Sequence, residues 1–177
     1  MTRRELFATL AIAPLLMAAS RAAAPATVLI TEFSASGRQS GTKRLAKLVR
    51  ADAEWRKVLS PIEYHVAREA GTERAYTGAT WNNHADGLYR CVCCNTALFD
   101  SRTKYESGTG WPSFWKPIAA TNVVETRDFG VLGERTAISC ALCDAHLGHV
   151  FADGPPPTGL RYCMNSAALR FFPRAAA

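Results

Sequence analysis

The chain has 177 residues, of which 48% are hydrophobic and 20% charged, the composition of an ordinary globular domain with a core. Its net charge is +6, and the 24 N-terminal residues carry three arginines and one glutamate, so 18 basic and 14 acidic residues, or +4, remain beyond them. Because this excess is mild and scattered, the short basic run at residues 43–50 is interpreted as a solvated face rather than a binding surface for an acidic partner.

Residues 1–24 have the features of an export signal. Arg3 and Arg4 precede an apolar run over residues 6–19, and Ala22 to Ala24 form an A-x-A cleavage sequence. The alternative is an amphipathic or buried N-terminal helix. The run is shorter than the ~20 residues that span a bilayer, so no stable membrane span is expected. The segment resembles a twin-arginine signal, which predicts an exported, periplasmic protein in an oxidising compartment.

Residues 25–50 are predicted to be a linker and N-terminal extension ahead of a domain over residues 51–174. A short apolar stretch at residues 27–33 is followed by "SASGRQSGT", residues 34–42. This Ser- and Gly-rich composition is typical of a flexible linker.

Two short helices are expected at the start of the domain. The first covers residues 52–59. The second begins after Ser60, which forms a capping box with Glu63 around a proline at the first helical position. It is expected to run from residue 61 to about 70 and to stop at Gly71.

Beyond Gly71 the helical periodicity disappears. Short segments such as "GLYRCVC", "NVVETR" and "ERTAISC" are separated by Gly, Pro, Asn and Asp. This pattern predicts short strands, mainly antiparallel, joined by long loops.

Four of the six cysteines form two C-x-x-C pairs, Cys91 with Cys94 and Cys140 with Cys143. Two such turns can supply a tetrahedral Cys₄ zinc site, which would connect two distant strands. A thioredoxin-type redox motif is disfavoured, since each pair follows a strand-like run rather than opening a helix. A pair of disulfides remains an alternative, because the predicted compartment permits it.

A nucleic-acid-binding zinc ribbon is another class of protein with paired cysteines. Such a module needs a basic stripe with exposed aromatic residues. The segment between the two pairs carries basic and acidic side chains in balance, so no nucleic-acid partner is expected.

Cys163 stands apart from these pairs in "RYCMNS". An isolated cysteine is most often a small buried apolar residue. On a strand, however, Arg161, Cys163 and Asn165 would share one face, while Tyr162 and Met164 would pack on the other. This alternation would place the Cys163 thiol between the polar side chains of Arg161 and Asn165.

Histidines and aromatic residues precede this strand. "DAHLGHVFADG" contains His146, His149 and Phe151, and "SGTGWPSFW" contains Trp111 among Gly and Pro. The histidines could equally be metal ligands or buried core residues, and Trp111 could line a pocket or fill the core.

The segments "GTGWPSF", "CDAHLGHVF", "PTGLRYC" and "NSAAL" resemble the methionine-R-sulfoxide reductases of the B family, in the same order and from about residue 55 to residue 172. The resemblance implies a compact, barrel-like, mainly β domain of two antiparallel sheets with N-terminal helices packed against it. It also implies an enzyme of protein repair that acts on oxidised proteins or peptides, and structural zinc. The implied zinc ligands are Cys91, Cys94, Cys140 and Cys143.

The same resemblance assigns the site residues. Cys163 matches the nucleophile, and Trp111 and Phe151 match the pocket for the substrate methyl group. The polar residues of the site match His146, His149, Arg161 and Asn165.

The chemistry requires a thiolate and an acid on opposite sides of the S–O bond. Arg161 is expected to favour the thiolate, and His149 to donate the proton, with His146 as the alternative. Asn165 would orient the substrate oxygen or a water. The attack would leave a sulfenic acid on Cys163.

Thr77 and Thr109 stand where the resemblance places resolving cysteines, which leaves Cys93 as a possible resolving residue. Direct reduction by a thioredoxin-like or other thiol donor is the alternative, and a monomer is expected. Two other classes of function stay open on the residues alone: a thiol peroxidase or disulfide exchanger, and a zinc-ordered binding module.

Overall fold

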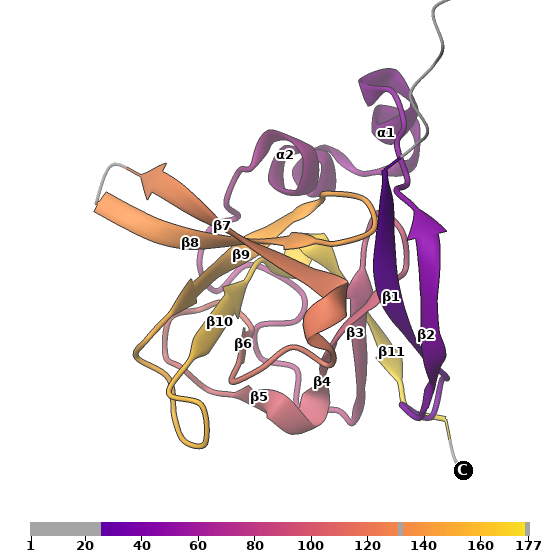
Figure 1. Ribbon diagram of the computed structural model, residues 1–177. Coiled ribbons are helices and arrows are strands. Elements are labelled where there is room, and N and C mark those ends of the chain that lie inside the picture. Colours follow the sequence, from indigo (N-terminus) through magenta and orange to yellow (C-terminus); the bar gives the residue numbers. More distant parts are fainter. Residues whose placement is uncertain (1–25, 131–132, 176–177) are drawn as a thin grey trace, which may run out of the picture.

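The computed structural model describes residues 26–130 and 133–175, so the predicted export signal over residues 1–24 lies outside the described residues. Short strands and a few helical turns make up this part of the chain (Figure 1). The strands are β1 Thr27–Phe33, β2 Gln39–Ala46, β3 Gly87–Cys91, β4 Ala97–Asp100, β5 Lys104–Tyr105, β6 Ser113–Phe114, β7 Val123–Gly130, β8 Gly133–Cys140, β9 His146–Phe151, β10 Arg161–Met164 and β11 Leu169–Pro173. The helices are α1 Asp52–Val58 and α2 Pro61–Glu69, with 3-10 turns η1 Ser101–Thr103, η2 Ala120–Asn122 and η3 Ser166–Ala168.

Both expected helices are present, and α2 has the predicted capping box. The Ser60 hydroxyl accepts a hydrogen bond from the Glu63 amide at 3.4 Å, and the Glu63 carboxylate accepts one from the Ser60 amide at 2.7 Å. The helix ends one residue earlier than expected, because Ala70 rather than Gly71 adopts the left-handed conformation at φ 54°. The helix buries Val66 and Ala67 and contacts β9 and η3.

The flexible linker predicted over residues 34–42 is wrong. Strands β1 and β2 form an antiparallel hairpin that pairs Thr27 with Ala46, and a tight turn at residues 34–38 joins them. Some Ser and Gly residues of this segment lie in the turn, where Gly37 adopts φ 77°. Others lie at exposed positions of β2. Composition suggested flexibility because it does not reveal the pairing partner.

The buried side-chain amide of Asn122 is one of the groups that attach the hairpin to the rest of the domain. Asn122 accepts a hydrogen bond from the Thr31 amide and donates to the carbonyls of Thr31 and Ala97, each at 2.8 Å. The Leu48 amide donates to the Leu142 carbonyl at 2.8 Å just after the hairpin. The hairpin therefore lies against the sheet that contains β3 and β4 (Figure 1).

The expectation of a mainly β fold with antiparallel sheets and N-terminal helices is confirmed. Besides the hairpin, a six-stranded sheet has the order β5-β6-β10-β9-β8-β7, and a three-stranded sheet has the order β11-β3-β4. Within residues 26–130 and 133–175, β5 and β7 do not pair with each other, so the larger sheet is not closed by a hydrogen-bonded ladder between its edges.

An aromatic core joins the two larger sheets. Tyr89 and Phe99 of the small sheet pack on Phe114 of the large one, with ring centroids 5.0 and 4.4 Å apart. Trp55 of α1 is fully buried in the same cluster. On β10, Tyr162 and Met164 point into this core, which directs Cys163 to the opposite face. Among the described helices, none has the length and apolar character needed to cross a membrane.

Candidate active site and metal centre

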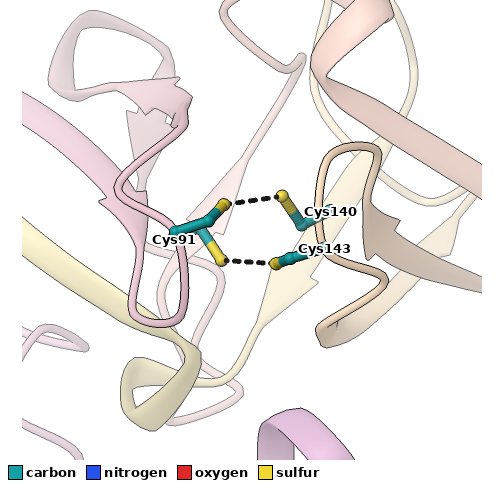
Figure 2. A group of neighbouring side chains, drawn as sticks. Cys91, Cys140 and Cys143 are labelled. Carbon is teal, nitrogen blue, oxygen red and sulfur yellow. Dashed lines mark hydrogen bonds between the residues drawn. The ribbon is translucent and has the colours of Figure 1, made fainter. Parts of the chain in front are cut away.

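The two C-x-x-C pairs meet at one place, although 45 residues separate them. The four sulfur atoms of Cys91, Cys94, Cys140 and Cys143 all lie within 4.8 Å of one another. Figure 2 shows the side chains of Cys91, Cys140 and Cys143 converging from the two turns. Cys91 is 3.6 Å from Cys143, and Cys94 is 3.5 Å from Cys140. These separations are far longer than a disulfide bond of about 2.05 Å. They are close to the ~3.8 Å edge of a tetrahedron of sulfurs placed about 2.3 Å from a zinc ion.

The two turns have the same backbone conformation. The Asn95 amide donates to the Cys91 carbonyl and the Asp144 amide to the Cys140 carbonyl, both at 2.9 Å. Asn95 and Asp144 adopt left-handed φ angles of 63° and 56°, which Asn and Asp tolerate better than most residues. Each turn follows a strand and does not open a helix. This placement agrees with a zinc site and differs from a thioredoxin motif, in which the C-x-x-C pair opens a helix.

The thiols of this cluster cannot all ionise by themselves. Hydrogen bonds led by that with Cys140 lower the pKa of Cys94 and raise the pKa of Cys143 far above its usual range. A bound cation would relieve this competition, because it attracts all four thiolates and offsets part of their negative charge. The donor set is therefore suited to a soft tetrahedral metal ion.

Cys163 lies in the middle of the large sheet. It stands directly opposite Ser113 of β6 on one side and His149 of β9 on the other, and Ser113 in turn stands opposite Tyr105 of β5. Directly opposed residues project to the same face of a sheet. The register therefore places Tyr105, Ser113, Cys163 and His149 in one row across four strands.

A pocket of about 150 Å³ opens at this row. It brings together five of the residues predicted from the sequence, Cys163, His149, Asn165, Trp111 and Phe151. Gly148 also lines the pocket, where β9 lies close to β10. Only glycine fits at this position, because a Cβ atom there would lie 2.2 Å from the Cys163 carbonyl oxygen. The full lining is Thr72, Trp111, Arg135, Gly148, His149, Phe151, Cys163, Met164 and Asn165.

Arg161 lies beside this pocket rather than in its wall. Its guanidinium donates two hydrogen bonds to Asp153, at 2.9 and 2.7 Å, and stacks over the Phe151 ring at 4.4 Å. Asp153 thus places a carboxylate beside the positive charge that faces Cys163. Burial raises the pKa of Cys163, and the Thr109 hydroxyl and the Arg161 charge oppose this effect.

Sequence reasoning missed the two residues that hold His149. The Asp128 carboxylate lies 2.9 Å from His149 Nε2 and 2.6 Å from the Arg135 guanidinium. The His149 hydrogen bond, followed by that of Arg135, lowers the pKa of Asp128, so this carboxylate is ionised at neutral pH. Asp128 and Arg135 are directly opposed on β7 and β8, and opposite charges flanking a hairpin tip are the signal that could have indicated the pair.

His146 has a different environment. It is buried, its Nε2 has no hydrogen-bond partner among the described residues, and its ring stacks edge-on against His149 at 5.3 Å. Burial lowers the pKa of His146 to about 4. A neutral imidazole at this position is poorly suited to donate a proton at neutral pH.

Glu73 is a third residue that sequence reasoning missed. Its backbone amide donates to the Asn165 side chain at 3.0 Å, and its carbonyl accepts from the Trp111 indole at 3.2 Å. Its buried carboxylate accepts from the amides of Ser166 and Ala167, at 2.5 and 2.9 Å. Asn165 also donates to the Leu147 carbonyl at 3.1 Å, so its amide is largely occupied by backbone groups.

The three positions considered for a resolving residue, Cys93, Thr109 and Thr77, have different environments. Cys93 lies in the metal-side turn, where hydrogen bonds led by that of Cys143 lower the pKa of Cys93 to about 4. It is not among the described residues that line the Cys163 pocket. Thr109 lies 3.8 Å from the Cys163 sulfur, whereas Thr77 is exposed and donates to the Arg74 carbonyl.

Fold and site define a β domain with a four-cysteine metal-binding arrangement and, away from it, a single cysteine in a pocket with a histidine. The family model of the SelR domain matches residues 59–173. Peptide methionine sulfoxide reductase MsrB of Pseudomonas fluorescens is 54% identical over 130 residues, which are 73% of this chain and all of that protein. MsrB of Acinetobacter baylyi is 56% identical over 126 residues, 71% of this chain and 91% of its own. The chloroplastic peptide methionine sulfoxide reductase B1 of Arabidopsis thaliana is 54% identical over 121 residues, 68% of this chain and 59% of its own.

The chain belongs to the SelR-domain family, the peptide methionine sulfoxide reductases of the MsrB type.

Proposed function

We propose that this enzyme reduces the R epimer of methionine sulfoxide in oxidised proteins and peptides, through a sulfenic acid on Cys163, and that an external thiol restores it. The observation that carries the proposal is the position of Cys163, directly opposite His149 at the floor of a pocket walled by Trp111 and Phe151. A nucleophile and a proton donor thus flank one small space.

The pocket suits a methyl sulfoxide group. The aromatic side chains of Trp111 and Phe151 offer an apolar surface to the methyl group, while His149 offers a ring nitrogen to the oxygen. The sulfur carries an oxygen, a methyl group and the methionine chain in a fixed pyramidal arrangement. With the methyl on the aromatic rings and the chain towards solvent, only one epimer directs its oxygen towards His149.

His149 is held for proton transfer by Asp128. The ionised carboxylate accepts the Nε2 hydrogen at 2.9 Å, which leaves Nδ1 as the nitrogen that can exchange a proton with the bound sulfoxide. In the reaction the Cys163 thiolate attacks the sulfoxide sulfur while the oxygen receives a proton. The oxygen is transferred to the Cys163 sulfur, so the thiol is oxidised to a sulfenic acid and the sulfoxide is reduced to methionine.

Reset requires two further electrons. A donor thiol condenses with the sulfenic acid to give a mixed disulfide and water, and a second thiol releases Cys163 as a free thiol. The position of Cys93 in the metal-side turn supports an external donor, thioredoxin-like or of another kind, over an internal disulfide.

The metal of this proposal is one structural zinc ion, held by Cys91, Cys94, Cys140 and Cys143. When bound it would offset part of the negative charge of the four thiolates and would connect β3 to β8. The proposed location is the periplasm, reached through the twin-arginine-like sequence over residues 1–24, and metal bound before export would protect these thiols from oxidation. The first residue of the mature protein, expected near Ala23 or Pro25, tests this part.

The enzymatic proposal is tested with the two epimers of methionine sulfoxide and one equivalent of substrate without reductant. The R epimer should release about one methionine per Cys163, since the reset step is withheld. Dimedone should then label Cys163, and Cys93→Ser should turn over normally with an added dithiol. Equal use of both epimers would contradict the proposed selectivity. An internal Cys93–Cys163 disulfide would contradict the external reset.

A further inference from the structure

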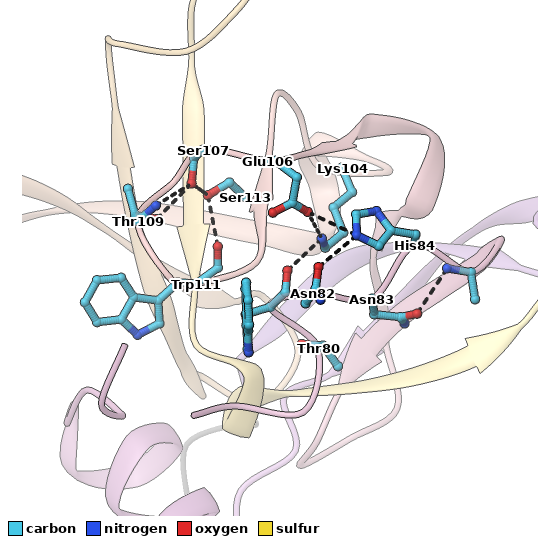
Figure 3. Close-up of polar contacts among 12 residues, drawn as sticks. Thr80, Asn82, Asn83, His84, Lys104, Glu106, Ser107, Thr109, Trp111 and Ser113 are labelled. Carbon is cyan, nitrogen blue, oxygen red and sulfur yellow. Dashed lines mark hydrogen bonds and ion pairs between the residues drawn. The ribbon is translucent and has the colours of Figure 1, made fainter. Parts of the chain in front are cut away.

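Three hydroxyl groups connect the Cys163 sulfur to the backbone of the pocket residue Trp111. The Thr109 hydroxyl lies 3.8 Å from the Cys163 sulfur and 2.8 Å from the Ser107 hydroxyl. Ser107 lies 2.7 Å from the Ser113 hydroxyl, which reaches the Trp111 carbonyl at 3.3 Å. Figure 3 shows the Ser107 oxygen between Thr109 and Ser113, with the Trp111 carbonyl beyond. We call Thr109, Ser107 and Ser113 the hydroxyl chain.

The hydroxyl chain is held in place by the sheet. Ser113 is fully buried on β6, between Tyr105 of β5 and Cys163 of β10. Ser107 and Thr109 are half-buried on the loop that joins β5 to β6, and the Thr109 amide also lies 3.5 Å from the Ser107 hydroxyl. Water therefore has little access to the inner end of the chain.

Each hydroxyl has one hydrogen to donate, so the chain can be ordered in only two directions. With Cys163 as a thiol, its S–H can donate to Thr109, Thr109 to Ser107, and Ser107 to Ser113. Ser113 then donates to the Trp111 carbonyl, which can only accept. Every hydroxyl donates once and accepts at least once in this order, and the thiol hydrogen also has an acceptor.

Ionisation of Cys163 favours the other direction. A thiolate can only accept, so Thr109 turns its hydrogen to the sulfur and accepts one from Ser107. Ser113 can follow and donate to Ser107, leaving the Trp111 carbonyl. A hydrogen bond to a charged acceptor is roughly twice as strong as a neutral one, so the exchange stabilises the ion.

We propose that Thr109 is a further catalytic residue, which donates its hydroxyl hydrogen to the ionised sulfur of Cys163, and that Ser107 and Ser113 are positioning residues that orient it. This deepens the proposed function, because it rests on Cys163 as the nucleophile. Arg161 also favours the ionised sulfur, but its guanidinium is shared with Asp153 through two hydrogen bonds.

Other ionisable groups face the same sulfur and must be kept constant in a test. They are Arg161 on the same strand, its partner Asp153 in the loop between β9 and β10, Tyr105 on β5 and His149 on β9. None of them belongs to the hydroxyl chain. Substitutions within the chain therefore change hydrogen bonding at Cys163 without changing any charge.

The test measures the rate of Cys163 alkylation by iodoacetamide against pH in the metal-loaded full chain, with the modified peptide identified by mass spectrometry. Thr109→Val keeps the shape of the side chain and removes the hydroxyl. It should raise the apparent pKa of Cys163 by about one unit, so that alkylation at neutral pH is about tenfold slower. Thr109→Ser should retain the wild-type profile.

Ser107→Ala should shift the profile in the same direction by a smaller amount, since Thr109 keeps its hydroxyl but loses its orienting partner. Thr77→Val, an equivalent substitution at an exposed threonine, should leave the profile unchanged. Wild-type profiles for both Thr109→Val and Ser107→Ala, or equal shifts for Thr109→Val and Thr109→Ser, would overturn the proposal. Because alkylation needs no sulfoxide, failure of the proposed reductase activity would be seen separately, as absence of methionine release.

Discussion

The four-cysteine metal site and the Cys163 pocket both depend on cysteine side chains, but the surroundings of these cysteines differ. At the four-cysteine site, the thiols converge from two turns with the same hydrogen-bond pattern, and three of the four cysteines are buried. At the pocket, one thiol stands among groups from several strands and loops, including His149 and Thr109. Local spacing along the chain builds the first site, whereas the register of a sheet builds the second. Substitutions should therefore affect folding at the first site and chemistry at the second.

The largest effect is expected from loss of one metal-side cysteine. Cys140→Ser should release the metal and leave the protein largely unfolded, because structural zinc contributes about 10 kcal/mol or more to folding in small sites, against a total stability of about 5–15 kcal/mol. Metal content and circular dichroism measure this. Cys93→Ser, in the turn of the same centre, is the matched control and should keep one metal ion per chain. Folded, metal-free Cys140→Ser protein would remove the distinction between the two sites.

The complementary substitution is Cys163→Ser. It should lower reductase activity by about a thousandfold or more, because the hydroxyl of serine is a far weaker nucleophile than a thiolate. The metal content and the unfolding temperature should stay at their wild-type values. Near-wild-type turnover would place the reaction at another cysteine.

A smaller effect on the same pocket is expected for Asp128→Asn. The amide has the shape of the carboxylate but cannot hold the Nε2 hydrogen of His149 as an ionised acceptor, so kcat should fall about 30- to 100-fold with little change in KM. Glu134→Gln on the same hairpin, where Glu134 pairs with Arg127 at the surface, should leave kcat unchanged. An equal loss in both variants would indicate that hairpin integrity, and not His149, is responsible.

The smallest effect concerns the buried histidine between the two sites. The pKa of His146 is lowered to about 4 in the folded protein, from about 6.5 when unfolded, so the unfolded chain binds more protons below pH 6.5. Stability linked to His146 is complete above that pH and is lost as the pH falls towards 4. Between pH 7 and pH 5 the loss should be about 2 kcal/mol.

Urea unfolding at the two pH values measures this loss, and His146→Gln should remove it. The exposed His84→Gln is the control and should behave as wild type. Acid also weakens metal binding by cysteines, but this effect is common to all three proteins. The same pH dependence in His146→Gln and wild type would show that His146 is accessible to protons in the folded state.

Much of the metal site could be predicted from the sequence. Two C-x-x-C pairs after strand-like segments indicated the four ligands, and the capping box around Pro61 indicated α2, because both signals act over a few residues. Alternation in "RYCMNS" also predicted that Tyr162 and Met164 face the core and Cys163 faces away. The export signal, the domain boundaries and the catalytic roles remain predictions.

Tertiary structure decided what depends on contacts between distant residues. Residues 34–42 form part of a hairpin rather than a linker, because distant residues such as Asn122 and Arg174 supply hydrogen bonds that attach the hairpin to the domain. Asp128 reaches His149 only through the pairing of β7, β8 and β9, and Glu73 reaches Asn165 and Trp111 only where three segments meet. The sequence by itself determined the local turns that present the four cysteines to a metal ion, and the residue types that the reaction at Cys163 requires. The register of the sheet decided which charges and hydroxyls surround Cys163, because a strand specifies its own two faces but not its neighbours.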